Sequence, residues 1–157
     1  MVEFNHIIVP TDFGEAAGCA AELAIDLAGK YKAKVTLVHA FMVPAVAYGD
    51  AIAFPVDSMI NAAEDALAKA VSQLRARYPN TSALLVRGEP WEEILAVARD
   101  RGADMIVMGT HGRRGLSRVF LGSVAEKVVR LSPVPVVTVS APPAAKEKAA
   151  SPSYQSA

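Results

Sequence analysis

Five short apolar segments alternate with segments of helical periodicity, and this alternation constrains the fold more than any other feature of the sequence. Four of the five are nearly continuous rather than alternating, which is typical of strands covered on both faces. They lie at residues 4–10, 34–40, 82–88, 104–109 and 134–140, and the helical patterns between them lie at 15–31, 57–77, 91–101 and 123–131. Strands that alternate with helices pair in parallel through right-handed crossovers. The sequence therefore predicts an α/β fold, a three-layer sandwich around a five-stranded parallel sheet with about four helices.

The length and charge of the chain bound its organisation. A chain of 157 residues fits one domain. We expect residues 1–140 to form it, and residues 141–157, which are poor in large apolar groups, to be a disordered tail. Sixteen basic residues balance sixteen acidic ones, so bulk charge does not favour a nucleic acid or a membrane as partner. No apolar segment reaches the roughly 20 residues that span a bilayer. The single cysteine, Cys19, and the lack of a secretory signal pattern predict a reducing, cytoplasmic location.

The loop after the fourth apolar segment carries the strongest functional signal. In an open parallel sheet, ligands bind beyond the carboxyl ends of the strands, where the strand order reverses. Gly109 and Gly112 lack a Cβ, so we expect positive φ there and a close approach of backbone amides to a ligand. Ser123 and Glu126 fit a capping box at the start of a helix, whose amides attract phosphate. The arginines between them, which could add charge-assisted contacts, are Arg113, Arg114 and Arg118.

The complete spacing of this loop points to a known family. Gly109, Gly112, Gly122 and Ser123 reproduce the pattern G-x2-G-x9-G-(S/T) of the ATP-binding branch of the universal stress protein family. The chain resembles that family from about Phe4 to Ser140, including IIVPTDF at the first strand, VTLVHA at the second, G-E-P-x-E-x-I from Gly88, and SPVPVVTV at the last. The resemblance implies an adenine-nucleotide alpha-hydrolase-like fold with strand order 3-2-1-4-5. It also implies ATP as ligand, across the gap between strands 1 and 4.

The resemblance also implies roles for individual residues. Pro10, Thr11 and Asp12 would border the adenine and ribose, and the backbone of Ala40 would contact the adenine edge. The loop would enclose the ribose and phosphates, and the start of the last helix would receive the terminal phosphates. These positions are Gly109, Thr110, His111, Gly112, Arg113, Arg114 and Gly115 on the loop, and Gly122, Ser123 and Val124 at the helix. Two departures are Gly14, where the family usually has Ser but which remains an acceptable N-cap, and Ala40, where valine is common.

Other nucleotide sites and catalysis fit less well. The one Gly-Lys pair, Gly29-Lys30, is followed by Tyr31 inside a helix pattern and does not match a P-loop. PTDFGE after the first strand does not match a dinucleotide fingerprint. Asp12 is the one carboxylate expected at the site, where it could help to hold a Mg²⁺ that phosphates and water otherwise bind. Of the histidines, His111 could be a base or a hydrogen-bonding wall.

Two further segments concern partners. The last strand, residues 134–140, would lie at a sheet edge, where an apolar strand invites pairing with another chain. Family members dimerise through this edge, so we expect a homodimer; the alternative is that the tail covers the edge. Residues 41–56 form a long connection with a single charged residue, Asp50. Such a connection is typical of a lid or an interface, with core packing as the alternative.

Three functions follow from these observations. The first is an ATP-binding universal stress protein that acts as a nucleotide-dependent regulator of the stress response or a chaperone-like sensor. The second is a slow ATPase or phosphotransferase that uses Asp12 with Mg²⁺ and the Ser123 region as an anion hole. The third is a nucleotide-free interaction or chaperone-like protein of the same fold, against which the complete glycine spacing argues.

Overall fold

The computed structural model describes residues 3–43, 55–111 and 121–142. Its elements follow in the order β1 (His6–Pro10), α1 (Glu15–Tyr31), β2 (Lys34–Phe41), α2 (Val56–Arg77), β3 (Thr81–Arg87), α3 (Pro90–Asp100), β4 (Met105–Gly109), α4 (Ser123–Leu131) and β5 (Val136–Val139). The five strands form one sheet in the order β3-β2-β1-β4-β5, and every neighbouring pair is parallel. The predicted fold class and strand order are therefore confirmed.

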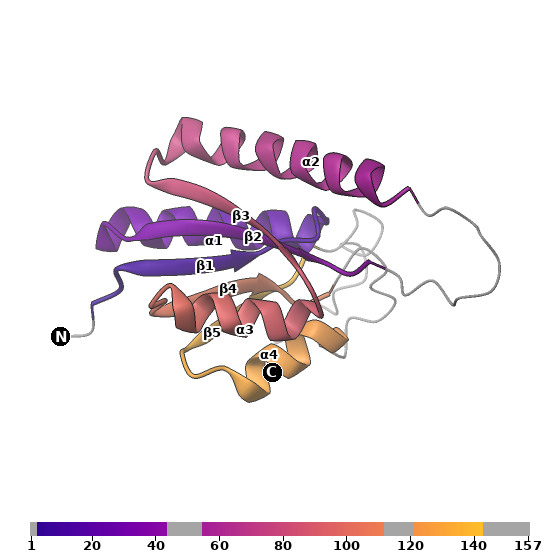
Figure 1. Cartoon of the computed structure of the whole chain (residues 1–157). Coiled ribbons are helices and arrows are strands. Elements are labelled where there is room, and N and C mark those ends of the chain that lie inside the picture. Colours follow the sequence, from indigo (N-terminus) through magenta and orange to yellow (C-terminus); the bar gives the residue numbers. More distant parts are fainter. Residues whose placement is uncertain (1–2, 44–54, 112–120, 143–157) are drawn as a thin grey trace, which may run out of the picture.

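Two helical layers cover the sheet. Helices α1 and α2 lie on one face, and α3 and α4 lie on the other (Figure 1). Strand β1, at the centre of the sheet, shows why its sequence is apolar at every position. Ile7 and Val9 pack with α1 and α2, whereas Ile8 packs with α3 and α4, and all three are fully buried. Successive side chains of a strand point to opposite faces, so a strand between two helical layers needs a continuous apolar run.

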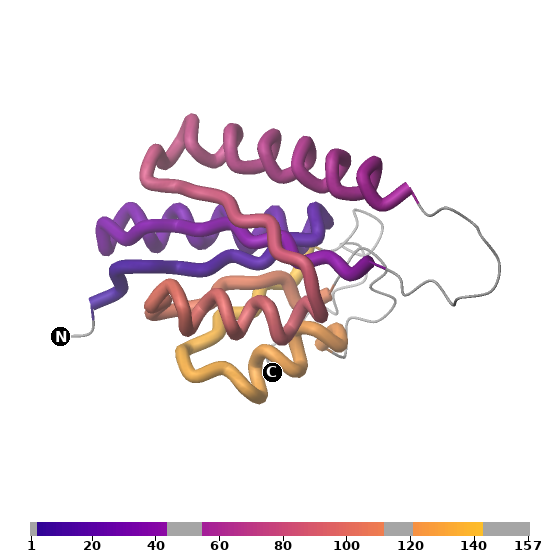
Figure 2. The backbone as a smooth tube through the Cα atoms, viewed as in Figure 1, coloured from indigo at the N-terminus to yellow at the C-terminus, as the bar shows by residue number. Residues whose placement is uncertain are grey.

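The order of the strands places a crevice beside β1. The chain runs from β1 outward to β2 and β3, then returns to the other side of β1 to form β4 and β5 (Figure 2). The helix that follows β1 packs on one face of the sheet, and the helix that follows β4 packs on the other. The two chain segments therefore separate beyond the carboxyl ends of β1 and β4, and leave a site for a ligand between them.

Local signals explain most helix boundaries. The N-cap of α1 is Gly14, as the sequence predicts, and its C-cap is Lys32, whose φ of 59° is left-handed. Pro90 occupies the first turn of α3, where its missing N–H costs nothing. Fully buried alanines on α1, Ala20, Ala24 and Ala28, let the helix lie close to the sheet. Of the segments expected to be a lid and a tail, residues 44–54 and 143–157 lie outside the described residues.

The predicted capping box at α4 is wrong. The N-cap residue is Gly122, so Ser123 is already the first residue of the helix and its hydroxyl does not cap the first turn. Glu126 instead forms an ion pair with Arg130, one turn further along the helix. The helix thus begins one residue earlier than a serine cap requires, because a glycine of extended conformation, with φ −61° and ψ 157°, precedes it.

A buried polar network lies at the amino ends of the strands, away from the crevice. The ring of His6 contacts the carbonyl oxygen of Arg101 through Nδ1 at 3.1 Å and the hydroxyl of Thr36 through Nε2 at 2.7 Å. The Thr36 hydroxyl is 3.0 Å from that of Ser82, so the network crosses β1, β2 and β3. Asp104 accepts hydrogen bonds from the amides of Asn5 and His6, and lies at this end as predicted. In the described part of the chain, no helix is long and apolar enough to span a membrane.

Candidate functional site

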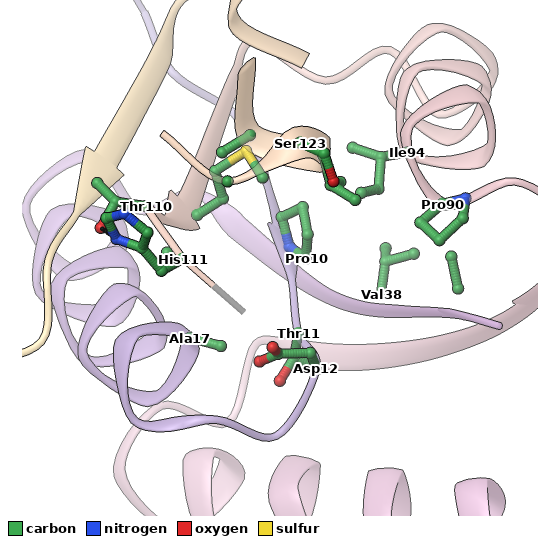
Figure 3. A pocket seen from close by; sticks show the side chains of 16 residues that line it. Pro10, Thr11, Asp12, Ala17, Val38, Pro90, Ile94, Thr110, His111 and Ser123 are labelled. Atoms are coloured by element: carbon green, nitrogen blue, oxygen red, sulfur yellow. Dashed lines mark hydrogen bonds between the residues drawn. The ribbon is translucent and has the colours of Figure 1, made fainter. Parts of the chain in front are cut away.

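A cavity of about 230 Å³ lies where the crevice was expected, at the carboxyl ends of β1 and β4. Figure 3 shows its lining, with residues from the β1 end, the β4 end and the start of α4 around one space. All the predicted site residues that the structure describes line it: Pro10, Thr11, Asp12, Ala40, Gly109, Thr110, His111, Gly122, Ser123 and Val124. The other predicted residues, Gly112, Arg113, Arg114 and Gly115, lie outside the described residues, as does Arg118.

The turn after β1 is held by several hydrogen bonds. The Thr11 amide donates to the carbonyl of Val38 at 2.8 Å, and the Gly14 amide donates to Oδ1 of Asp12 at 2.8 Å. His39 Nδ1 lies 2.8 Å from the Thr11 carbonyl, to which it must donate because that oxygen has no proton. Phe13 adopts a left-handed φ of 64°, and its ring packs against His39 at 4.5 Å between centroids. This shape presents Thr11 and Asp12 to the cavity.

Gly109 has a different role from the one predicted. Positive φ occurs at Gly88 and Gly102 but not at Gly109, so the expectation of a left-handed conformation there is wrong. A Cβ at Gly109 would lie 2.9 Å from Cβ of Ala16 and 3.0 Å from the backbone nitrogen of Ala17. The glycine is therefore required by the close packing of β4 against the first turn of α1. This contact brings the β1 and β4 loops together at the cavity.

The start of α4 offers backbone amides to the cavity. Gly122 and Ser123 line it, and in the described part of the chain no side chain caps this helix terminus. The Gly122 amide donates to the carbonyl of Thr110 at 2.7 Å, which ties the start of α4 to the end of β4. The first amides of a helix lack intrahelical acceptors and lie at the positive end of the helix dipole. An anion is the ligand that such a terminus favours.

One side of the cavity is apolar, and sequence reasoning did not assign most of it to the site. Val38, Pro90 and Ile94 lie across the cavity from His111 and Thr110 (Figure 3). The lining residues that were missed are Ala17, Val38, Pro90, Ile94, Met108 and Ala125. The family pattern that begins at Gly88 contains Pro90 and Ile94, so this pattern could have assigned these two residues to the site. Met108 lies at the carboxyl end of a buried strand, where ligands bind in such sheets, so its position could have assigned one more residue to the site.

The described lining of the cavity has few acidic side chains. Asp12 is the one carboxylate among the described lining residues, and one of its oxygens accepts the Gly14 amide. The described residues contain no group of three or more histidine, cysteine, aspartate or glutamate side chains that could hold a metal ion. The described site therefore offers an apolar surface on one side and the amides of a helix terminus at α4, with Asp12 as its one described carboxylate.

Comparison with known proteins identifies the family. The family model described as the universal stress protein family matches residues 3–140 of the chain. The chain belongs to the universal stress protein family. One relative of this universal stress protein, from Methanocaldococcus jannaschii, is 31% identical over 145 residues, which cover 88% of this chain and 84% of the relative. The solved structure of universal stress protein UspA from Lactobacillus plantarum is 26% identical, with a TM-score of 0.75, and covers 88% of this chain and 99% of its own.

Two structures of similar fold contain adenine nucleotides. A universal stress protein in complex with cAMP has a TM-score of 0.70 at 22% identity, and covers 90% of this chain and 100% of its own. A universal stress protein from Archaeoglobus fulgidus in complex with dAMP has a TM-score of 0.64 at 24% identity, and covers 88% of this chain and 99% of its own. At these identities the likeness concerns the fold.

Proposed function

We propose that the cavity beside β1 and β4 binds an adenine nucleotide, with ATP as the expected ligand, and that the protein is a nucleotide-dependent regulator of a stress response. One observation carries the proposal: the residues predicted for this role come from segments far apart in the sequence, and all of those described line one cavity. The fold's relatives with bound cAMP and dAMP add support.

The two sides of the cavity suit the two ends of a nucleotide. A purine ring is flat and apolar on its faces, and Val38, Pro90 and Ile94 offer an apolar surface for it. The phosphates are anions, and the first amides of α4, at Ser123 and Val124, offer donors at the positive end of the helix. Ligand pockets commonly begin at about 300 Å³. The described cavity, at about 230 Å³, is smaller than this, so we propose that it holds the base and sugar, with the phosphates extending along the start of α4.

The site favours binding over rapid hydrolysis. Phosphoryl transfer needs ligands for a metal ion and a group that positions the nucleophile. Asp12 is the one acidic side chain of the described lining, and the Gly14 amide already engages one of its oxygens. Any Mg²⁺ would then arrive with the nucleotide, held chiefly by phosphate and water, with Asp12 at most as an additional contact. Regulation by occupancy of the site requires no turnover.

We also propose a homodimer that forms through the edge of the sheet. Strand β5 is the terminal strand of the order, next to β4 alone among the described strands. Its residues are half-buried or exposed, although three of the four are valine. An apolar edge with unpaired backbone groups is a surface on which a second copy can add its own strand.

Substitution of Gly122 tests the nucleotide proposal. Gly122 has φ −61° and ψ 157°, which any residue can adopt, so Gly122→Val should fold. The added side chain would occupy the cavity at the start of α4. By isothermal calorimetry on protein stripped of ligand, we expect wild-type protein to bind ATP and Gly122→Val to lose at least about tenfold in affinity, or roughly 1.4 kcal/mol.

Gly29→Val is the matched control. Gly29 lies near the end of α1, where an added Cβ meets nothing within 4 Å. This variant should bind ATP like the wild type. Folded wild-type protein that gives no heat with ATP, ADP or AMP would contradict the proposal. If Gly122→Val bound ATP as tightly as the wild type, the start of α4 would not belong to the nucleotide site. Chromatography of nucleotide released from denatured protein separates ATP binding from hydrolysis, since a hydrolase would release chiefly diphosphate or monophosphate.

A further inference from the structure

A second cavity, of about 470 Å³, lies between α1 and α2. It is larger than the cavity beside β1 and β4 and adjoins it, because Thr11 and Ala17 line both. Its walls come from the two helices, its floor from β2 and α2, and one end from the turn between β1 and α1. Sites for small molecules have volumes of about 300–1,000 Å³, so this cavity is large enough to hold a ligand of its own.

The two helices leave this space because they face each other with small residues. Gly18 of α1 lies at the wall, and a Cβ added there would meet nothing within 4 Å. The floor is apolar, since it contains Leu37 of β2 and Leu74 of α2, which are both buried. An occupant would therefore have apolar groups beneath it and on both sides. The alanines that line the walls are Ala17 and Ala21 on α1, and Ala66 and Ala70 on α2.

The two ends of the cavity differ in charge. Glu22 of α1 and Arg77 of α2 form an ion pair at one end. Gly14 and Lys69 line the cavity about two turns earlier on the same two helices, toward the turn that follows β1. At 1.5 Å per residue, the walls between these ends are about 12 Å long. A space that follows two helices over this length suits an unbranched chain.

Lys69 supplies the charge that an occupant can use. Arg77 is already neutralised by its ion pair, whereas Lys69 forms no ion pair with a described residue. Asp65, one turn before Lys69 on α2, does not line the cavity. The Thr11 hydroxyl accepts the Phe13 amide at 3.0 Å and can still donate its own proton at this end. One cation and one hydroxyl donor match a carboxylate, whereas a phosphate group carries a charge of about −1.5 to −2 at pH 7.

We propose that the cavity between α1 and α2 binds a free monocarboxylate with an unbranched apolar chain, such as a medium-chain fatty acid. The chain lies between the small residues of the two helices, and the carboxylate lies at Lys69. This site is distinct from the proposed nucleotide site and does not depend on it. Because Thr11 and Ala17 belong to both linings, the two ligands would occupy opposite sides of one wall.

Calorimetry with three probes tests the class of ligand. Decanoate, kept below its micelle concentration, should bind wild-type protein saturably. Octanoate, which is two methylenes shorter, should bind about tenfold more weakly, because each buried methylene contributes to affinity. Decanol has the same chain without the charge, and should bind about fivefold more weakly than decanoate, the effect of an ion pair that is partly exposed to water.

Two variants test the place of the ligand. Gly18→Leu puts a side chain into open space at the wall, so the protein should fold but lose at least about tenfold in affinity for decanoate. Gly29→Leu is the matched control, since an added Cβ on the same helix also meets nothing but lies outside the cavity.

Lys69→Met should bind decanoate about fivefold more weakly and decanol as before. Its control, Lys30→Met, also removes an exposed lysine, but outside this lining.

Four results would overturn the inference. Decanoate that does not bind saturably would show that the cavity takes no such ligand. Unchanged affinity of Gly18→Leu would put the ligand elsewhere. Decanol that binds as tightly as decanoate would remove the role of Lys69. If Gly18→Leu, but not Gly29→Leu, altered the sedimentation of the protein, the groove would be a contact between copies of the chain. Gly18 and Lys69 do not line the nucleotide cavity, so these failures would leave the proposed function intact.

Discussion

His6 and His111 show how differently two histidines of one sheet are used. Both have a threonine hydroxyl as partner, but His6 also contacts the Arg101 carbonyl and so has partners for both ring nitrogens. Burial lowers the pKa of His6 below its ordinary value of 6.5, and the Lys34 charge lowers it further, while the Arg101 carbonyl and the Asp104 carboxylate partly oppose this shift. His6 is thus a structural group of the core, which favours its neutral form.

The lowered pKa of His6 predicts a loss of stability in weak acid. Because its pKa is lower in the folded state, the unfolded chain binds the proton first as the pH falls through 6.5. The stability due to neutral His6 is present above this pH and should be lost as the pH falls from 6.5 to the folded pKa. Urea unfolding of wild type and His6→Gln at several pH values between about 7 and 5 measures this.

The difference between the two proteins isolates His6, because the other two histidines are present in both. Wild-type protein should lose more free energy of unfolding than His6→Gln on acidification. If the free energies of unfolding of the two proteins changed with pH in parallel, the network at the amino ends of the strands would tolerate a protonated His6, which contradicts the prediction.

The sequence predicted least about the hydrogen-bond partners of individual residues. No partner could be named for His6 from the sequence, because Thr36 and Arg101 lie 30 and 95 residues away. The same holds for Thr110 and Ser140, which are 30 residues apart. Such pairs form only after strands align in register, and neither composition nor periodicity carries that register. Glycine spacing, by contrast, predicted a site at Gly109 and Gly122, and both residues line the cavity, but the positive φ expected at Gly109 is wrong.

At the scale of elements, hydrophobic periodicity was sufficient to predict which segments form helices and strands. The predicted helix 15–31 matches α1, and the other predicted helices differ from α2, α3 and α4 by at most one residue at either end. The strand ends vary by up to two residues. Caps were harder to predict, because the choice between Gly122 and Ser123 as the N-cap depends on the path of the preceding chain. The packing of β4 on α1 was also absent from the sequence pattern, since it joins Gly109 to Ala16 and Ala17.

This packing predicts that Gly109→Ala is destabilising. The new Cβ would lie 3.0 Å from the backbone carbon of Ala16 and 3.0 Å from the nitrogen of Ala17, which cannot rotate away. We expect a loss of about 1–3 kcal/mol in the free energy of unfolding, the usual cost of overpacking. Denaturant titration provides the measurement.

Gly18→Ala serves as the comparison. Gly18 is on α1, and an added Cβ there has nothing within 4 Å, so alanine should stabilise the helix by roughly 0.5–1 kcal/mol. If Gly109→Ala were as stable as wild type, α1 would have to be free to move away from β4, and the junction of the two loops would not be rigid.

For the whole molecule, the order of the strands determines both proposals about partners. Alternating strand and helix patterns predicted parallel pairing, and the family resemblance supplied the order 3-2-1-4-5, which the structure has. That order puts β1 beside the crevice and β5 at the edge. The pattern alone could not have ordered the strands, because all five are apolar and several arrangements would bury them.

The edge position of β5 predicts that Thr138→Pro prevents dimerisation. The carbonyls of Pro135 and Val139 bond to β4, so the amide of Thr138, one residue before Val139, points away from β4. Proline at this position removes a donor needed by a second copy but no bond within the sheet. Sedimentation at micromolar concentration should show a dimer for wild type and a monomer for Thr138→Pro.

Thr138→Val retains the amide and should remain dimeric. Far-ultraviolet circular dichroism would verify that the proline variant keeps its fold. Wild-type protein that sediments as a monomer, or a Thr138→Pro variant that remains a dimer, would contradict pairing through this edge.

The hydrogen bond between the Gly122 amide and the Thr110 carbonyl has a consequence for how the chain can be altered. It joins two backbone groups twelve positions apart, so it holds the end of β4 directly to the start of α4. Gly122→Pro, which lacks the donor, should therefore loosen this junction, whereas a substitution at Thr110 that changes only its side chain should keep it.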